Sequence, residues 1–197
     1  LPKPVLLFAS SREGEEVLFI DALKALGDKA EAVQWLIVPR HPQRFDEVAQ
    51  LLSEKGFAVS RRSQWQELPP VSDGAIWLGD SLGEMTLYYG LSSAALMGGS
   101  FAPLGGQNLI EALACGCPVL VGPHTFNFSQ ASEEAVQAGA ALRVANMSSA
   151  LSEALALVAD PEHLTAARQN GKQMMQRNRG AAAATARAVI DLMNAPK

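Results

Sequence analysis

The 197-residue chain has few cysteines, few histidines and no long apolar run. Its two cysteines, Cys115 and Cys117, are one residue apart, and no further ligand residues lie at a spacing typical of a metal site. We therefore expect two small buried thiols in a reducing compartment and no bound metal. No apolar stretch reaches the roughly 20 residues that a membrane-spanning helix needs, and we find no signal peptide.

Charged residues are also scarce: they make up only 18% of the chain, and the formal net charge is −4. Nucleic-acid-binding domains usually carry a basic face, so this balance argues against nucleic acid as a partner. A small anionic ligand needs only a local group of donors. The hydrophobic fraction of 48% indicates an ordered globular protein that can bury a core without disulfide or metal support.

Short apolar runs alternate with amphipathic stretches along the whole chain. Continuous apolar strands that alternate with helices form parallel sheets covered on both faces, so we predict one doubly wound α/β domain over residues 1–197. The predicted strands cover residues 5–10, 32–39, 57–63, 74–80, 94–99, 117–123 and 141–145. The predicted helices cover residues 15–26, 44–55, 83–91, 108–115, 129–138, 148–159, 162–178 and 181–194.

Ligands of such sheets bind beyond the carboxyl ends of the strands, so the loops there carry the candidate site. After the first strand, Ser11, Arg12 and Glu13 precede a helix entrance, where backbone N–H groups and the helix dipole favour an anion. A helix cap by Ser10 or Ser11 explains the hydroxyls equally well. Arg12 opposes the dipole unless an anion offsets its charge.

The loop after the second strand, PRHPQR from Pro39 to Arg44, concentrates positive charge between two prolines. Arginine can bind a phosphate or carboxylate with two parallel hydrogen bonds, and the prolines lower the cost of ordering the loop. An ordinary solvated loop explains the same composition. After the fourth strand, Ser81 and Glu84 have the S-x-x-E spacing of a capping box, which by itself indicates only a helix start.

Glycines and one acid follow the fifth strand, in the stretch GGSFAPLGGQNLIE from Gly98 to Glu111. The glycines allow positive φ and a close approach of the backbone to a ligand. Asn108 is expected to begin a helix whose free N–H groups face the same crevice. Glu111, expected one turn inside, can accept hydrogen bonds from ribose hydroxyls, although the helix dipole alone also favours an acid there. The pattern is not G-x-G-x-x-G after a first strand, so we expect no NAD site.

Four stretches together carry a more specific signal: ASSREGEE, PRHPQRF, DSLGEMTLYYGLSSAALMGGSF and GGQNLIEALACGCPVLVGPHTFNF. In order and spacing they resemble the C-terminal half of the 3-deoxy-D-manno-oct-2-ulosonic acid (Kdo) transferases of lipopolysaccharide synthesis, over essentially the whole chain. The resemblance implies a Rossmann-like domain, the C-terminal half of a two-domain GT-B glycosyltransferase. It also implies an inverting reaction, without metal or cofactor, that moves Kdo from CMP-Kdo to the lipid A precursor (lipid IVA).

In that family the C-terminal domain binds the donor. The N-terminal domain supplies the acceptor surface, the face that associates with the cytoplasmic side of the bacterial inner membrane, and a carboxylate base. The sequence enters a strand almost at once and has no initiating Met, so we expect a fragment that lacks the N-terminal domain. Such a soluble fragment is expected to bind CMP-Kdo weakly and to transfer nothing alone.

The resemblance assigns roles residue by residue. Arg40 looks like the contact to the donor phosphate or to the Kdo carboxylate and is a candidate charge stabiliser, whereas no catalytic residue is expected in this fragment. Glu111 looks like the ribose contact. Many relatives carry Thr-His where this chain has Ser11-Arg12, so the role of Arg12 stays open. The full implied donor-binding set is Ser11, Arg12, Glu13, Arg40, His41, Gly83, Glu84, Met85, Gly99, Ser100, Asn108 and Glu111.

Two other functions compete with this interpretation. Another GT-B transferase or epimerase that uses a UDP-sugar shares the glycine-rich loop and the acid, but it does not require PRHPQRF. A non-catalytic nucleotide-binding domain is an alternative from a different class. Binding of CMP against UDP separates the first alternative from a Kdo transferase.

Overall fold

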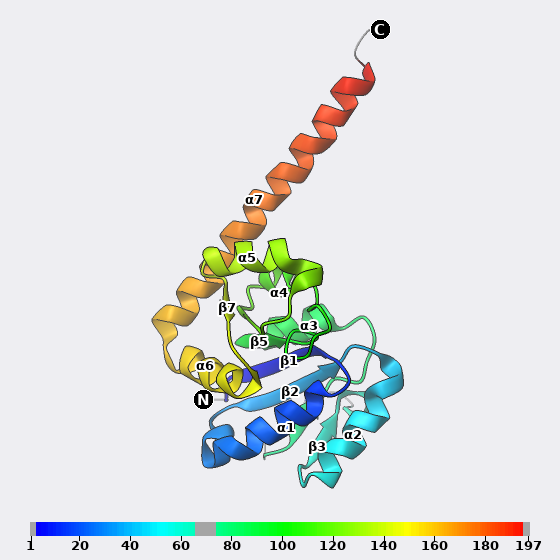
Figure 1. The fold of residues 1–197 in the computed structure, drawn as a ribbon, viewed down its shortest axis with the longest axis vertical. Coiled ribbons are helices and arrows are strands. Elements are labelled where there is room, and N and C mark those ends of the chain that lie inside the picture. The colour runs from blue at the N-terminus through cyan, green and yellow to red at the C-terminus, as the bar shows by residue number, and fades with distance from the viewer. Residues whose placement is uncertain (1–2, 66–73, 195–197) are drawn as a thin grey trace.

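The structure is a computed structural model that describes residues 3–65 and 74–194. Within these residues, seven parallel strands form one sheet in the order β3-β4-β2-β1-β5-β6-β7 (Figure 1). The strands are β1 (Val5–Ser11), β2 (Gln34–Pro39), β3 (Val59–Arg61), β4 (Ile76–Leu78), β5 (Ala94–Met97), β6 (Val119–Val121) and β7 (Ala141–Arg143). The predicted single α/β domain with a doubly wound parallel sheet is confirmed.

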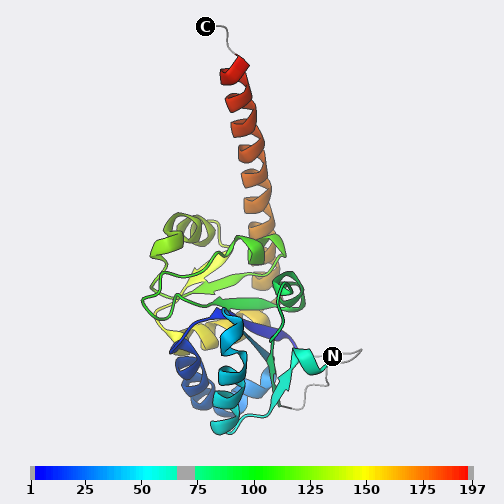
Figure 2. The same cartoon turned by 90° about the vertical axis from the view of Figure 1, so that its right-hand side faces the viewer.

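Helices cover both faces of this sheet (Figures 1 and 2). The core on one face includes residues of α1, α2 and α6, and the core on the other includes residues of α3, α4, α5 and α7. The helices are α1 (Glu15–Leu26), α2 (Phe45–Glu54), α3 (Met85–Leu91), α4 (Ile110–Ala114), α5 (Ser129–Gln137), α6 (Met147–Ala159) and α7 (Pro161–Asn194). Four 3-10 segments are η1 (Gly27–Ala32), η2 (Pro42–Arg44), η3 (Arg62–Gln64) and η4 (Phe126–Phe128) among the described residues.

Strand β1 shows why the strands have continuous apolar sequences. Leu6 and Phe8 belong to the core under α1, where the Phe8 ring lies 5.1 Å from that of Phe19, while Leu7 and Ala9 belong to the core on the opposite face. Because successive side chains of a strand point to opposite faces, a strand buried on both sides needs apolar residues throughout.

The last two predicted helices form one. Residues 162–178 and 181–194 were expected as separate helices, but α7 runs unbroken from Pro161 to Asn194. Gly180 lies inside it, and a glycine in a helix costs only about 1 kcal/mol. The outer part of α7 extends away from the sheet in both views (Figures 1 and 2).

Neither Ser10 nor Ser11, the two candidate capping residues, caps the start of α1. Its N-cap residue is Gly14, at φ 86°, with no side-chain cap. Ser10 has φ 55° and interrupts the pairing of β1 with β2. The carbonyl oxygen of Ser10 packs against Gly98, where a Cβ atom would lie only 2.2 Å from it. The first strand and the glycine-rich segment therefore meet by backbone contact, which only glycine permits at Gly98.

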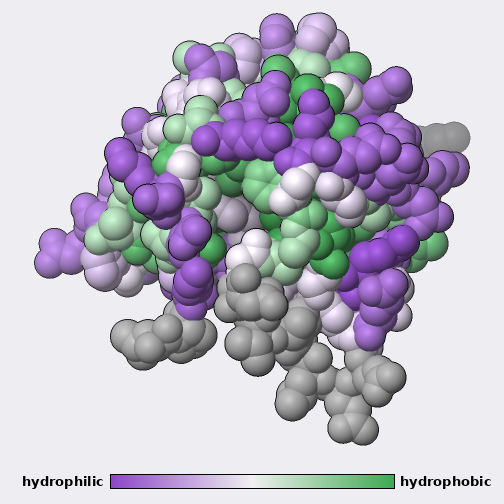
Figure 3. Space-filling view, turned by 90° about the horizontal axis from the view of Figure 1, so that it is seen from below, coloured by the Kyte–Doolittle hydropathy of each residue, from purple (hydrophilic) through white to green (hydrophobic). Residues whose placement is uncertain are grey.

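Seen from the end opposite the projecting part of α7, hydrophilic side chains lie above and to both sides of an apolar area near the centre of the view (Figure 3). None of the helices in residues 3–65 and 74–194 is both long enough and apolar enough to cross a bilayer.

Candidate functional site

The candidate site lies at the carboxyl edge of the sheet, around neighbouring strands β1 and β5. From β1 the chain continues through α1 to β2 on one side, and from β5 it continues through α4 to β6 on the other. Such a reversal leaves a crevice between loops that turn to opposite faces. The loops after β1, β2, β4 and β5 all end at this edge, as the sequence predicted.

Glu15, which sequence reasoning missed, joins the first loop to the glycine-rich loop. Its carboxylate is fully buried and accepts hydrogen bonds from the backbone N–H groups of Arg12 (2.9 Å), Gly99 (2.7 Å), Phe101 (2.9 Å) and Ala102 (3.3 Å). Burial raises the pKa of Glu15, although these four hydrogen bonds oppose the shift. The only sequence signal is an acid in a first helical turn, since the partners in the glycine-rich loop, Gly99, Phe101 and Ala102, lie more than 80 residues away.

Ser11 and Arg44 have protein partners. The Ser11 hydroxyl is buried and donates to Glu16 Oε1 at 2.8 Å. The Arg44 guanidinium pairs with Glu16 at 2.7 Å and with Glu47 at 2.9 Å. Buried Glu16 takes both groups, so the Ser11 hydroxyl and the Arg44 guanidinium are engaged within the protein.

Arg40 and its neighbours present their charge to solvent. Arg40 is exposed at the end of β2, and its Nε donates to Gln107 Oε1 at 3.3 Å. His41 and Glu13 are also exposed, and Arg12 is half-buried. No ion pair between described residues involves Arg12 or Arg40, so both guanidinium groups are available to an anion.

The S-x-x-E pair after β4 does not form a capping box. The N-cap residue of α3 is Glu84 itself, with no side-chain cap. The Ser81 hydroxyl instead donates to the Glu84 carboxylate and contacts the Tyr88 hydroxyl. Glu84 also pairs with Arg62 at 2.9 Å. The hydrogen bond from Ser81 is the main cause that lowers the pKa of Glu84, and the ion pair with Arg62 adds to it. Partial burial acts in the opposite direction but is outweighed.

Asp80 ties the end of β4 to the end of β3. It accepts hydrogen bonds from the Ser63 backbone N–H (2.8 Å) and hydroxyl (2.6 Å), and it pairs with Arg61 at 2.7 Å. Burial opposes the charge on Asp80, but the hydrogen bonds from Ser63 and Arg61 outweigh it and lower its pKa. Asp80 thus fixes the loop that leads to Gly83, which is exposed at φ 77°.

The glycine-rich loop has the predicted positive φ values, 71° at Gly99, 91° at Gly105 and 79° at Gly106. Its polar groups are used internally. The Ser100 hydroxyl is fully buried, donates to the Met97 carbonyl and accepts from the Gly122 N–H at 2.8 Å. Since Glu15 takes the Gly99 N–H, the Gly99 N–H and the Ser100 hydroxyl are used to hold strand ends together.

Glu111 lies in the loop-to-helix segment that follows β5, at the start of α4. Helix α4 begins at Ile110 and not at Asn108, so Glu111 is the second residue of the helix, in its first turn. Its carboxylate is exposed and accepts a hydrogen bond from Thr86 at 3.1 Å. Asn108 is exposed, and its side-chain oxygen accepts from the Ile110 N–H at 3.0 Å. Met85 is half-buried and packs on the core beside the sheet.

Three contacts thus connect the loops: Glu15 with Gly99, Arg40 with Gln107, and Thr86 with Glu111. They leave the guanidinium groups of Arg12 and Arg40 and the exposed carboxylate of Glu111 without an ion-pair partner among the described residues, along a single edge of the sheet. This combination suits a ligand that carries both negative charge and hydroxyl groups.

The cysteines are free, and Cys117 is buried, which raises its pKa to about 12. Burial also raises the pKa of Cys115. Both thiols are therefore protonated at neutral pH and poorly reactive. Across the described part of the chain, no three His, Cys, Asp or Glu side chains come together as a metal site would require.

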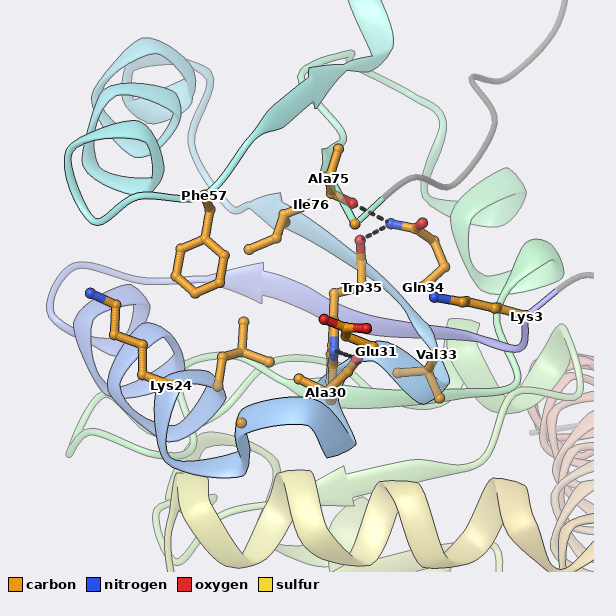
Figure 4. A pocket seen from close by; sticks show the side chains of 13 residues that line it. Lys3, Lys24, Ala30, Glu31, Val33, Gln34, Trp35, Phe57, Ala75 and Ile76 are labelled. Atoms are coloured by element: carbon orange, nitrogen blue, oxygen red, sulfur yellow. Dashed lines mark hydrogen bonds between the residues drawn. The ribbon is translucent and has the colours of Figure 1, made fainter.

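A cavity of about 260 Å³ lies at the opposite, amino edge of the sheet (Figure 4). Its walls include Trp35, Phe57 and Ile76. Gln34 donates to the carbonyls of Trp35 and Ala75, which ties the starts of β2 and β4 together. Ligands of parallel sheets bind at the carboxyl ends of the strands, so the polar loops at the other edge are the better candidate site.

No family model matches the chain. The chain is 47% identical over 193 residues to the 3-deoxy-D-manno-octulosonic acid transferase of Bordetella pertussis, an alignment that covers 96% of this chain and 45% of that protein. It is 39% identical over 180 residues to the enzyme of the same name from Haemophilus influenzae, covering 91% of this chain and 42% of that protein. The chain therefore spans less than half the length of these curated relatives.

Among solved structures, the C-terminal CMP-Kdo binding domain of WaaA from Acinetobacter baumannii matches with a TM-score of 0.80 and 31% identity, over 88% of this chain and 90% of that domain. Anabaena Alr3699/HepE in complex with UDP-glucose matches with a TM-score of 0.60 and 16% identity, over 89% of this chain and 44% of that protein. The second likeness shows the fold alone.

Proposed function

The chain belongs to the Kdo transferase family and corresponds to the C-terminal domain of these enzymes, and we propose that it binds CMP-Kdo as the donor for Kdo transfer. The observation that carries the proposal is the match over 90% of a CMP-Kdo binding domain. In the whole protein, we propose, Kdo passes with inversion from CMP-Kdo to a lipid A precursor, without metal or cofactor, at the cytoplasmic face of the inner membrane.

The residues of the carboxyl edge fit this donor. CMP-Kdo carries a phosphate and a carboxylate, and Arg40 and Arg12 offer guanidinium groups to either anion. Arginine binds such groups with two parallel hydrogen bonds, and a fixed cation also stabilises the charge that develops on a departing CMP. Arg40 is therefore the proposed charge stabiliser, with exposed His41 beside it.

The nucleotide is proposed to lie along α3 and α4. Glu111 would accept hydrogen bonds from the ribose hydroxyls, with Asn108 next to it and Thr86 holding the carboxylate in place. Gly83, Glu84 and Met85 would flank the nucleotide. Glu84 is already paired with Arg62, which suits a positioning role and not proton transfer. The base that activates the acceptor is proposed to lie in the other half of the protein, so the fragment should bind and not transfer.

Calorimetric titration of the chain with CMP and with UDP tests the proposal. CMP should bind and UDP should bind at least about tenfold more weakly, because one base-specific pocket rarely accepts both nucleotides equally. Preference for UDP would indicate a UDP-sugar enzyme, and binding of neither nucleotide would remove the donor-site proposal. Transfer of Kdo to lipid acceptor by this chain alone would contradict the proposed inactivity of the fragment.

A further inference from the structure

Glu15 is an acid that the proposed donor site does not use directly, although it is completely buried beside that site. Both of its carboxylate oxygens are engaged, Oε2 by Arg12 and Gly99 and Oε1 by Phe101 and Ala102. One side chain of α1 therefore anchors the glycine-rich loop to the loop after β1. Hydrogen bonds between backbone N–H groups and an ionised carboxylate are stronger than those between neutral groups.

The anchored loop leads directly to Arg40. The Gly99 carbonyl accepts from the Gly106 N–H at 2.7 Å, which closes the loop on itself. The next residue, Gln107, then accepts from Arg40 Nε at 3.3 Å. The Arg40 backbone N–H in turn donates to the Ser11 carbonyl at 3.0 Å, in the first loop. The contacts form a closed ring from the first loop through Glu15, Gly99, Gln107 and Arg40 back to the first loop.

Glycine is required at two points of the ring. Gly99 and Gly106 have φ values of 71° and 79°, which L side chains rarely adopt. A Cβ atom at Gly99 would also lie 3.1 Å from the Gly106 carbonyl oxygen. Segments rich in glycine gain conformational entropy when unanchored, so the ring needs a strong restraint to hold one geometry. Glu15 supplies that restraint with four hydrogen bonds.

We propose that Glu15 is a positioning residue that fixes the glycine-rich loop, and through Gln107 the Arg40 guanidinium, in the geometry that receives the anionic groups of the donor. This positioning role of Glu15 rests on the proposed donor function. The effect of Glu15 on the glycine-rich loop does not depend on a ligand. Glu15 itself does not contact the donor, because all four of its hydrogen-bond partners are backbone groups of the protein.

The first test needs no ligand. Amide hydrogen exchange in Glu15→Gln should become at least about tenfold faster either at Gly99 or at Phe101 and Ala102, because glutamine replaces one of the two accepting oxygens with an NH₂ group that cannot accept a hydrogen bond. Exchange in the centre of β1, at Leu7 and Phe8, should not change. Glu153→Gln on α6, an exposed acid far from the site, serves as the matched control. Unchanged exchange at the three loop amides would overturn the proposal.

The second test measures CMP affinity by calorimetry. Glu15→Gln should weaken CMP binding by about tenfold or more, since small displacements of a charged contact are costly, and Glu15→Asp should recover part of the loss. In a double-mutant cycle, the fold loss of CMP affinity in the Glu15→Gln, Arg40→Ala double variant should be smaller than the product of the fold losses in the two single variants, because Glu15 acts through Arg40. Fully multiplicative losses would contradict the proposal.

The two tests separate the two proposals. If the wild-type chain binds no CMP, the donor function fails, while the exchange rates still decide whether Glu15 holds the loop. If the wild-type chain binds CMP and Glu15→Gln binds it equally well, the positioning role fails and the donor function stands.

Discussion

Arg40 and Arg44 are only four residues apart in PRHPQR, yet the fold gives them opposite roles. Arg44 is the last residue of the 3-10 turn η2 and pairs with buried Glu16, whereas Arg40 stays exposed at the end of β2. The sequence predicts a cationic loop at this sheet edge but not which arginine is paired. That choice depends on Glu16, an acid 28 residues away whose burial no local pattern reveals.

Arg40→Ala should weaken CMP binding by about tenfold or more, since it removes a charge-assisted contact. The side chain is exposed and its one described hydrogen bond, to Gln107, is long, so the free energy of unfolding should change by less than about 0.5 kcal/mol. Calorimetry and urea unfolding measure the two quantities. Arg187→Ala, an exposed arginine on the outer part of α7, is the control and should bind like wild type. Equal affinity in Arg40→Ala and wild type would remove Arg40 from the site.

Asp80 and Glu15 should give opposite pH dependence of stability. The pKa of Asp80 is lowered in the fold, so its contribution is present above the unfolded pKa of about 3.9 and is lost as the pH falls through the folded value. The pKa of Glu15 is raised, so its contribution is complete below the unfolded pKa of about 4.3 and is lost as the pH rises through the folded value.

Urea unfolding between about pH 3 and pH 7 tests these signs. Relative to wild type, Asp80→Asn should lose less stability on acidification, and Glu15→Gln should lose less as the pH rises above about 4.3. The comparison uses the slope of the free energy of unfolding against pH and not its absolute value, because each substitution also removes hydrogen bonds. If both variants have the same slope as the wild type, neither carboxyl group has a different pKa in the folded and the unfolded chain.

At the scale of elements, periodicity predicts the order of strands and helices, because the central strands β1, β2, β5 and β6 are buried on both faces and helices such as α2 bury one face. Ends and caps are less predictable. The S-x-x-E pattern at Ser81 caps nothing, whereas Asn146 and Ser149 form a reciprocal capping box at the start of α6. Both sequences offer suitable side chains, and the path of the preceding loop decides which one reaches the free N–H groups.

The junction of β1 and β5 gives a test at this scale. Gly98→Ala would place a Cβ atom 2.2 Å from the Ser10 carbonyl oxygen, so it should destabilise the fold by about 1–3 kcal/mol. Gly90→Ala is the matched control, because Gly90 lies in α3 with nothing within 4 Å of an added Cβ. It should stabilise the fold by about 0.5–1 kcal/mol through helix propensity. Equal unfolding free energies for the two variants would contradict the close approach.

For the whole molecule, the sheet could be predicted from the sequence, and so could the edge that carries the site. The ring of contacts through Glu15 could not, because it joins loops more than 80 residues apart through backbone groups that every residue has. The same limit applies to Ser100, whose hydroxyl suits a ligand by composition and is taken by Met97 and Gly122 in the fold.

Helix α7 divides into an inner part that packs on the sheet and an outer part that does not. Ala167, Met174 and Met175 are buried, whereas Ile190 and Met193 are 55% and 79% exposed. Deletion of residues 178–197 should therefore change the free energy of unfolding by less than about 1 kcal/mol. Met174→Ala should cost about 2–5 kcal/mol. Urea unfolding with circular dichroism compares the two, and a large loss on truncation would show that the outer part supports the fold.

The length of α7 also makes it a lever. At 1.5 Å per residue, Asn194 lies about 28 Å beyond Met175 along the helix axis, so a tilt of about 10° at the base moves the tip by about 5 Å. The base rests on α4, where Lys172 packs over Gly116 and Gly171 against Leu113. Helix α4 also carries Glu111 at its start, so the displacement of a probe attached at Arg187 would measure any tilt of α7 that accompanies binding at the proposed ribose contact.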